Sequence, residues 1–258
     1  MSEDRSGKRS APGSEMLVAD YSFEQFIVAE SNRLAFEAAL SICKEQNSPY
    51  NPLFFYGPTG VGKTHLLSAI VNHFKANNPR CKVIFCRGDD YTRELIMSIR
   101  NNDIDSFRNM YRNADVLILD DIQYIAGRAS TQEELLHTFN KLYETGQRIV
   151  LAADCAPQEI PDLDEKLKSR LCSGLAVGIV PMEAETKKRY VKVQASSLQL
   201  TITDETIDYI ANSSEESAWE LRGLLRKICA VHELTEKAID LEAVKRILES
   251  KKTTADDK

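Results

Sequence analysis

The chain has 258 residues, of which 43% are apolar and 28% are charged, and its formal net charge is −6. These values are ordinary for a soluble globular protein with a sizeable core. No apolar run approaches the ~18 residues of a membrane span, the polar N-terminus does not resemble a signal peptide, and the acidic balance argues against strong autonomous binding of duplex DNA.

The cysteine and histidine patterns indicate neither disulfides nor a metal site. The six cysteines occur singly, without a CxxC pair, and the four histidines show no metal-ligand spacing. Single cysteines in apolar runs of a cytosolic chain usually serve as small core residues. We therefore expect a cytoplasmic protein.

The N-terminal part is predicted to be irregular. Residues 1–15 are polar and read as a disordered leader. The aromatic segment 21–26 either packs against a nucleotide base or caps the core. A helix is predicted from Ser31 to Gln46, with Leu34, Ala38 and Ile42 on its apolar side.

A glycine-rich loop follows a short apolar run. Residues 52–56 predict a buried strand, residues 65–71 predict a helix, and Gly57–Thr64 between them match G-x-x-x-x-G-K-[ST]. Strand, loop and helix form a phosphate cradle, in which backbone N–H groups and the helix N-terminus surround an anion. Lys63 would reach the β- and γ-phosphates, and the Thr64 hydroxyl would hold Mg²⁺. The alternative is a surface turn, but the flanking elements favour a nucleoside-triphosphate site.

Two acids end a later strand. A second strand is predicted at 82–86. Helices are predicted at 91–100, with Leu95, Ile96 and Ile99 as its apolar positions, and at 104–111. The third strand, 115–121, ends on Asp120 and Asp121. At the carboxyl edge of a parallel sheet, Asp120 would position Mg²⁺ through water and Asp121 would polarise the attacking water.

The remaining elements alternate and then become helical. The βαβ pattern continues with a helix at 132–144, a strand at 148–154, a short basic helix at 166–170 and a strand at 175–180. This alternation predicts a parallel sheet. Beyond residue 183 only helices are predicted, at 183–198, 204–212, 217–233 and 240–250.

Several stretches together resemble the ATPase core of the bacterial DnaA replication-initiator family of AAA+ proteins. They are Phe23–Phe26 with Ser31–Arg33, Tyr50–Phe54 running into the glycine loop, Phe107–Tyr111, Leu119–Gln123 followed by Thr131–Glu134, and Lys168–Arg170 followed by Gly174–Leu175. The resemblance spans about 21–248. It implies an α/β fold, a five-stranded parallel sheet sandwiched by helices, with a C-terminal helical lid. The expected boundaries are a disordered leader at 1–15, the AAA+ domain at 16–181, the lid at 182–250 and a disordered tail at 251–258.

The resemblance also implies roles for individual residues. Lys63 and Thr64 are similar to the Walker A pair and Asp120 and Asp121 to Walker B. Asp154 is similar to the sensor-1 residue. Arg170 resembles the arginine finger, which enters a neighbouring subunit's site and contacts its γ-phosphate; a guanidinium suits this role. The expected nucleotide-binding residues are Gly57, Pro58, Thr59, Gly60, Val61, Gly62, Lys63, Thr64, His65 and Asp120.

The sequence departs from the family pattern at two motifs. Trp219 stands where the sensor-2 arginine is expected, so we expect slow ATP hydrolysis. In the single-strand-binding element, Arg128 keeps one cation and Ser130 replaces the other, while Ile96 retains the apolar contact. Weak binding of single-stranded DNA is therefore expected. The family's duplex-reading helix-turn-helix domain is not found in this sequence, so no specific duplex reading is expected.

These observations favour a slow ATPase that uses ATP or ADP with Mg²⁺ and assembles head-to-tail in replication initiation. One alternative is a regulator of the Hda type that docks on a full-length initiator through Arg170. A weaker alternative is a helicase loader of the DnaC type.

Overall fold

The computed structural model describes residues 21–44, 49–213, 217–235 and 239–252, except for the side chains of 249–252. The predicted leader 1–15 and residues 253–258 of the predicted tail lie outside this set. The chain divides into two compact units. Of the described residues, the first contains those up to Phe26, in Arg33–Gly57 and in Lys63–Ile179, and the second contains those in Ile27–Asn32, in Pro58–Gly62 and from Val180 onward.

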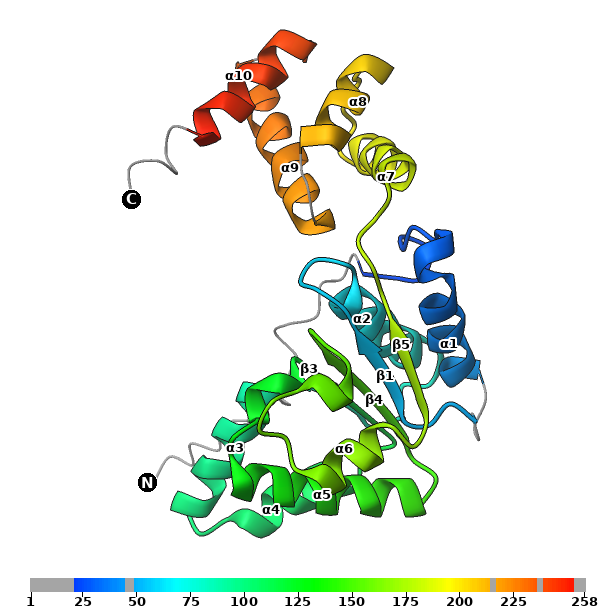
Figure 1. The fold of residues 1–258 in the computed structure, drawn as a ribbon, viewed down its shortest axis with the longest axis vertical. Coiled ribbons are helices and arrows are strands. Elements are labelled where there is room, and N and C mark those ends of the chain that lie inside the picture. Colours follow the sequence, from blue (N-terminus) through cyan, green and yellow to red (C-terminus); the bar gives the residue numbers. More distant parts are fainter. Residues whose placement is uncertain (1–20, 45–48, 214–216, 236–238, 253–258) are drawn as a thin grey trace, which may run out of the picture. The chain divides into compact units, whose positions relative to one another are not determined.

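A parallel sheet forms the centre of the first unit (Figure 1). Within the described residues it has five strands, in the order β2-β3-β4-β1-β5. The strands are β1 (Leu53–Tyr56), β2 (Val83–Arg87), β3 (Val116–Asp120), β4 (Arg148–Ala153) and β5 (Leu175–Gly178). The predicted sheet and its parallel pairing are therefore confirmed.

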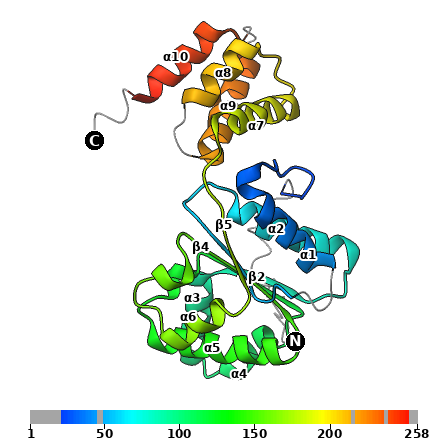
Figure 2. The ribbon, with the colours of Figure 1, turned by 45° about the vertical axis from the view of Figure 1, so that its right-hand side comes forward.

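Helices cover both faces of this sheet. They are α1 (Arg33–Lys44), α2 (Lys63–Asn77), α3 (Gly88–Arg100), α4 (Ile104–Arg112), α5 (Ala129–Glu144) and α6 (Glu165–Leu171). Helices α1 and α2 lie on one face, and α3 to α6 lie on the other (Figures 1 and 2). Short 3₁₀ helices at Glu30–Asn32, Ile122–Ile125 and Pro157–Glu159 were not predicted.

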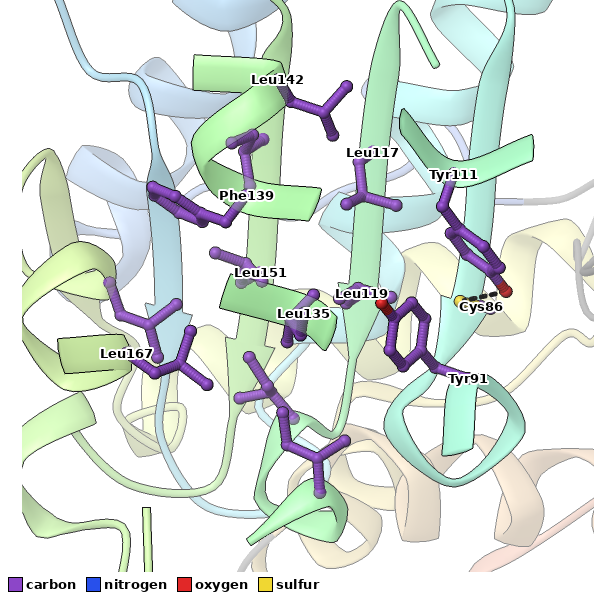
Figure 3. Packing of buried hydrophobic residues seen from close by; sticks show 14 of the residues in the cluster. Cys86, Tyr91, Tyr111, Leu117, Leu119, Leu135, Phe139, Leu142, Leu151 and Leu167 are labelled. Atoms are coloured by element: carbon purple, nitrogen blue, oxygen red, sulfur yellow. Dashed lines mark hydrogen bonds between the residues drawn. The ribbon is translucent and has the colours of Figure 1, made fainter. Parts of the chain in front are cut away.

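A buried core lies between the sheet, including β3, and α5. Leu117 and Leu119 of β3 belong to one buried cluster with Leu135 and Phe139, which are spaced four residues apart on α5 (Figure 3). All four side chains are buried. Full burial of such a side chain contributes roughly 1.5–3 kcal/mol each. Asp120 follows these buried residues at the carboxyl end of β3.

The second unit contains the C-terminal helices and has a core of its own. Its helices are α7 (Ala184–Ser197), α8 (Asp204–Ser213), α9 (Ala218–Thr235) and α10 (Leu241–Lys252). Val191, Ile210, Leu225 and Val244 each contribute a buried side chain from one of the four helices. The predicted C-terminal helices are thus present, and α10 continues two residues into the predicted tail. Among the described residues, no helix has the length and apolar character needed to cross a bilayer.

Several predicted boundaries were wrong. Helix α3 begins at Gly88, not Tyr91, and α5 begins at Ala129, not Gln132. Apolar periodicity marks only the packed middle of a helix, whereas a first turn commonly carries polar residues such as Asp89. Strand β3 ends at Asp120 because Asp121 has a left-handed backbone with φ of 53°.

Some predicted core positions were also wrong. Leu34 and Ile99 are exposed, whereas Ala38, Ile42 and Leu95, which were predicted on the same apolar sides, are buried. The predicted end of the first helix, Gln46, lies outside the described residues. The six cysteines all lie in the described part of the chain and are free there; Cys43 and Cys86 are buried, and the other four are half-buried.

Candidate functional site

The glycine loop connects β1 to α2 with a backbone that its glycines make possible. Gly57 follows β1 directly, and Lys63 is the first residue of α2. The φ angles of Gly57, Gly60 and Gly62 are 147°, 86° and 108°. Side chains disfavour this region, so the three glycines of the motif are needed for the shape of the loop. The result is a strand, glycine loop and helix in the order that a phosphate cradle requires.

Lys63 places a buried cation beside this loop. Its side chain is only 6% exposed, and its Nζ donates to Gly57 O at 2.6 Å and to Asp154 Oδ1 at 3.0 Å. A buried ammonium is costly unless it is paired and hydrogen-bonded, and these partners meet that need. The structure therefore brings together Lys63 and Asp154, which are 91 residues apart in sequence.

Thr64 and Asp120 form the second contact of the site. The Thr64 hydroxyl donates to Asp120 Oδ2 at 2.6 Å, and the Asp121 N–H donates to Asp120 Oδ1 at 2.9 Å. Asp120 is 2% exposed. Burial raises the pKa of this carboxyl above its usual value, and the hydrogen bond from Thr64 opposes the rise.

These two side chains fit a Mg²⁺ ion. Hydroxyl and carboxylate oxygens are the ligands that Mg²⁺ prefers, and its charge would offset the cost of an ionised, buried Asp120. No group of three His, Cys, Asp or Glu residues in the described part could hold a metal ion. Water and phosphate oxygens would therefore complete the coordination, as is usual for Mg²⁺ beside a nucleotide.

Asp121 is held by two side chains that the sequence analysis missed. Arg87 Nη2 lies 3.1 Å from Asp121 Oδ2, and Gln123 Nε2 donates to Asp121 Oδ1 at 3.2 Å. Arg87 ends β2. A polar residue at the carboxyl end of a strand is the signal that identified Asp120, and it could have identified Arg87 too. Gln123 lies in the stretch Leu119–Gln123 that carries the family resemblance, but the sequence analysis assigned it no role.

The N-terminal aromatic segment packs against α1 and α2. The ring of His65 stacks on Tyr21 with centroids 4.6 Å apart, and its Nε2 lies 2.8 Å from Ser22 O. Phe26 packs edge-on against His65 and stacks on Phe36. Of the two roles considered for this segment, the observed packing is that of a cap on the helices. The His65 side chain is engaged there.

Three further predicted site residues lie elsewhere in the first unit. Arg170 is exposed on α6, Arg128 is exposed just before α5, and Ile96 is 44% exposed on α3. Within the described residues, no hydrogen bond or ion pair joins any of the three to Lys63 or to the site's carboxylates.

The site therefore gathers one buried cation, one hydroxyl and three carboxylates. They come from the carboxyl ends of β3 and β4 and from the start of α2, which follows β1, and these strands are neighbours in the sheet. Ligands bind at this edge of open α/β sheets. A cation for phosphate, oxygen ligands for Mg²⁺ and carboxylates near the same point suit the binding and hydrolysis of a nucleoside triphosphate.

The sequence is similar to bacterial replication initiators. The family described as "Bacterial DnaA ATPAse domain" matches residues 17–178. The chromosomal replication initiator protein DnaA of Caldanaerobacter subterraneus subsp. tengcongensis is 43% identical over 228 residues, which are 88% of this chain and 52% of that protein. The DnaA of Thermomicrobium roseum is 43% identical over 221 residues, 86% of this chain and 48% of that protein. The chain thus spans about half the length of these curated relatives.

Solved structures show the same likeness. Domain III of Thermotoga maritima DnaA superposes with a TM-score of 0.87 at 33% identity, covering 91% of this chain and 98% of that one. A replication initiator DnaA bound to AMPPCP and single-stranded DNA superposes with a TM-score of 0.78 at 35% identity. The match covers 85% of this chain and 69% of that one. The T. maritima RuvB branch migration motor shares the fold alone. It is 18% identical, with a TM-score of 0.67, and the match covers 89% of this chain and 72% of that one.

Proposed function

The chain belongs to the bacterial DnaA ATPase-domain family, and from this premise we propose that it binds ATP in the loop Gly57–Thr64 during the initiation of replication. The single observation that carries the proposal is the buried Lys63 ammonium at the glycine loop. Triphosphate oxygens are strong partners for such a cation. The AMPPCP complex of a homologue at 35% identity supports the same conclusion.

Mg²⁺ is proposed to enter with the nucleotide. Thr64 and Asp120 would hold it, partly through water, and the ion would supply charge that neutralises the phosphates. The loop residues 57–62 and the start of α2, including His65, are proposed to surround ATP or ADP through their backbone N–H groups.

Hydrolysis is proposed to be slow. Asp121 would polarise the attacking water, Asp154 would sense the γ-phosphate, and Arg170 would complete the site from a neighbouring subunit. Trp219, which replaces the expected sensor-2 arginine, cannot neutralise phosphate charge. An ordinary enzyme turns over at about 1 s⁻¹ or faster, and we expect this chain to fall below that range.

Weak contact with single-stranded DNA is proposed through Ile96 and Arg128. The exposure of both side chains supports this proposal, as does the homologue bound to AMPPCP and single-stranded DNA. A single cation per subunit gives a weak and salt-sensitive contact. No specific reading of duplex DNA is proposed. The absence of disulfides among the six cysteines supports a cytoplasmic location.

Nucleotide calorimetry of the Lys63→Ala variant tests the function. We expect ATP affinity to fall by at least about tenfold, because the triphosphate loses a charge-assisted hydrogen bond. Lys141→Ala, which removes an exposed lysine of α5, is the matched control and should bind ATP as the wild type does. Equal ATP affinity for Lys63→Ala and the wild type would refute the proposed phosphate site.

One observation favours a second candidate, a regulator that docks on a full-length initiator. Trp219 on α9 is 74% exposed, and an exposed indole is common at the centre of protein interfaces. Co-sedimentation with a full-length initiator, with the wild type and with Trp219→Ala, distinguishes this candidate from self-assembly. Complex formation that depends on Trp219, without self-assembly of this chain, would favour the regulator.

A further inference from the structure

The side chain of Gln132 joins α5 to the segment that precedes α6. Gln132 lies at the start of α5 and is 4% exposed. Its Nε2 donates to Asp162 O at 3.0 Å, and its Oε1 accepts from the Asp164 N–H at 2.6 Å. Helices α5 and α6 lie side by side (Figures 1 and 2). One buried carboxamide therefore connects the beginnings of two neighbouring helices.

The backbone groups around Gln132 decide which way its amide faces. A backbone carbonyl only accepts a hydrogen bond, and a backbone N–H only donates one. Turning the amide round would place Oε1 against Asp162 O and Nε2 against the Asp164 N–H, and it would lose both bonds. In the observed orientation both ends of the carboxamide are satisfied, as buried polar groups require.

Asp162 is held from a second direction as well. Its carbonyl also accepts from the Gly127 N–H at 2.9 Å. Asp162 has a left-handed backbone, with φ of 53°. A side chain disfavours this conformation, which persists only where the surroundings hold it in place. The bonds from Gln132 and Gly127 supply that support.

Asp164 carries the link into α6. It is the N-cap of this helix, and its Oδ1 accepts from the backbone N–H groups of Lys166 at 2.9 Å and Leu167 at 3.2 Å. An N-cap of this kind satisfies donors of the first turn and sets where the helix begins. The side chain of Gln132 thus fixes the start of the helix that carries Arg170.

The backbone of Gln132 holds the other exposed cation of the proposed function. Its N–H donates to Arg128 O at 3.0 Å, and Arg128 is the N-cap residue of α5. Arg128 and Arg170 are therefore both tied to Gln132, the first through its main chain and the second through its side chain. The two arginines are exposed and have different proposed partners, a single strand and a neighbouring subunit's ATP.

We propose that Gln132 is a positioning residue that keeps Arg128 and Arg170 in one fixed arrangement, so that assembly through Arg170 presents Arg128 at regular intervals to a single strand. The inference rests on the proposed function. Weak contacts add up along a strand only where the geometry lets them form together. Assembly and strand binding then strengthen each other, and by the same factor in both directions.

The test measures this mutual strengthening in the full chain. Sedimentation with a non-hydrolysable ATP analogue, with and without an oligothymidine strand, gives the factor by which the strand promotes assembly. Gln132→Met has a side chain of similar length that can neither donate to Asp162 O nor accept from the Asp164 N–H. We expect this strand factor to fall at least about threefold in the variant. ATP affinity, measured by calorimetry, should stay within about twofold, since the loop Gly57–Thr64 is proposed to carry it.

Gln147→Met is the matched control. Gln147 is a half-buried glutamine that precedes β4. This variant should keep the wild-type strand factor, and thermal unfolding of both variants reports whether the fold is kept. A purely structural role for Gln132 would lower the melting temperature and leave the strand factor unchanged.

A second variant removes only one of the two side-chain bonds. Gln132→Glu keeps an acceptor for the Asp164 N–H, but its ionised carboxyl cannot donate to Asp162 O. We expect the strand factor to fall at least about twofold at pH 7. This variant also decides the question if Gln132→Met does not fold.

The possible results separate the inference from the function on which it rests. A wild-type strand factor in folded Gln132→Met, or in Gln132→Glu where Gln132→Met does not fold, overturns the positioning role and leaves the proposed function intact. A wild-type chain that neither assembles with the ATP analogue nor binds the strand overturns the proposed function and the inference together.

Discussion

Gly88 shows how a single residue controls the placement of Asp121. It is the first residue of α3, and a Cβ built there would lie 2.7 Å from Asp121 O and 3.4 Å from Ile122 Cα. Both neighbouring atoms belong to the backbone, so neither can move aside as a flexible side chain would. Asp121 is already in a left-handed conformation, which restricts its options further.

We expect Gly88→Ala to destabilise the fold by about 1–3 kcal/mol, the usual cost of overpacking, and to slow ATP hydrolysis. Urea unfolding and single-turnover hydrolysis measure the two effects. Gly223→Ala on α9 is the control, because a Cβ there meets nothing within 4 Å, and it should raise stability by about 0.5–1 kcal/mol. Wild-type stability and activity in Gly88→Ala would contradict the close approach.

At the scale of elements, Glu134, Arg108 and Arg112 form a charged cluster that joins α4 to α5. Glu134 on α5 accepts hydrogen bonds from Arg108 at 2.9 Å and from Arg112 at 2.5 Å, both on α4. Burial alone would raise the pKa of Glu134. The hydrogen bonds and charges of the two arginines outweigh that effect and lower the pKa below its usual value.

The lowered pKa of Glu134 determines how its contribution to stability changes with pH. The contribution of Glu134 is fully present above the pKa of the unfolded chain, about 4.3, and is lost as the pH falls through the lower native pKa. We expect Glu134→Gln to cost about 1.5–3 kcal/mol at pH 7, since it weakens hydrogen bonds to charged groups. Its deficit relative to the wild type should shrink below about pH 4.

Chemical unfolding across this pH range measures the deficit. Glu133→Gln, at an exposed neighbouring position of α5, is the control and should change stability by no more than about 0.5 kcal/mol. A deficit for Glu134→Gln that is constant from pH 7 to pH 3 would mean that charge is not what fastens α4 to α5.

At the scale of the whole molecule, Arg170 bears on assembly. Its exposed position on α6 leaves it accessible to a neighbouring subunit. We expect ATP, but not ADP, to promote head-to-tail association, because ADP lacks the γ-phosphate that the guanidinium would pair with. Such contacts are heterologous and build rings or helical filaments. Sedimentation with an ATP analogue and with ADP measures the association.

The Arg170→Ala variant should lose the nucleotide dependence, whereas Arg80→Ala, which removes an exposed arginine before β2, should keep it. Anisotropy of a labelled single strand is a second readout, since assembly would add weak contacts along the strand. Identical profiles for the wild type and Arg170→Ala with both nucleotides would leave Arg170 as an ordinary surface charge.

The sequence by itself determined the features that are local. The glycine loop is eight contiguous residues, and the strand and helix beside it are short periodic patterns. All three could therefore be predicted directly from the sequence. The alternation of strands and helices was enough to predict the parallel sheet. Helix starts at Gly88 and Ala129 were missed because first turns lack the apolar signal, and Ile99 was misjudged because periodicity does not say which of several adjacent apolar residues meets the core.

Only the tertiary structure decided which side chains of the site contact one another. Lys63 and Asp154 are 91 residues apart and Gln123 and Asp154 are 31 apart, and Arg87 meets Asp121 from another strand. These pairs form because parallel strands bring their carboxyl ends to one edge once the sheet has assembled. A polar contact of this kind depends on side-chain orientation across neighbouring strands, which leaves no periodic trace in the sequence.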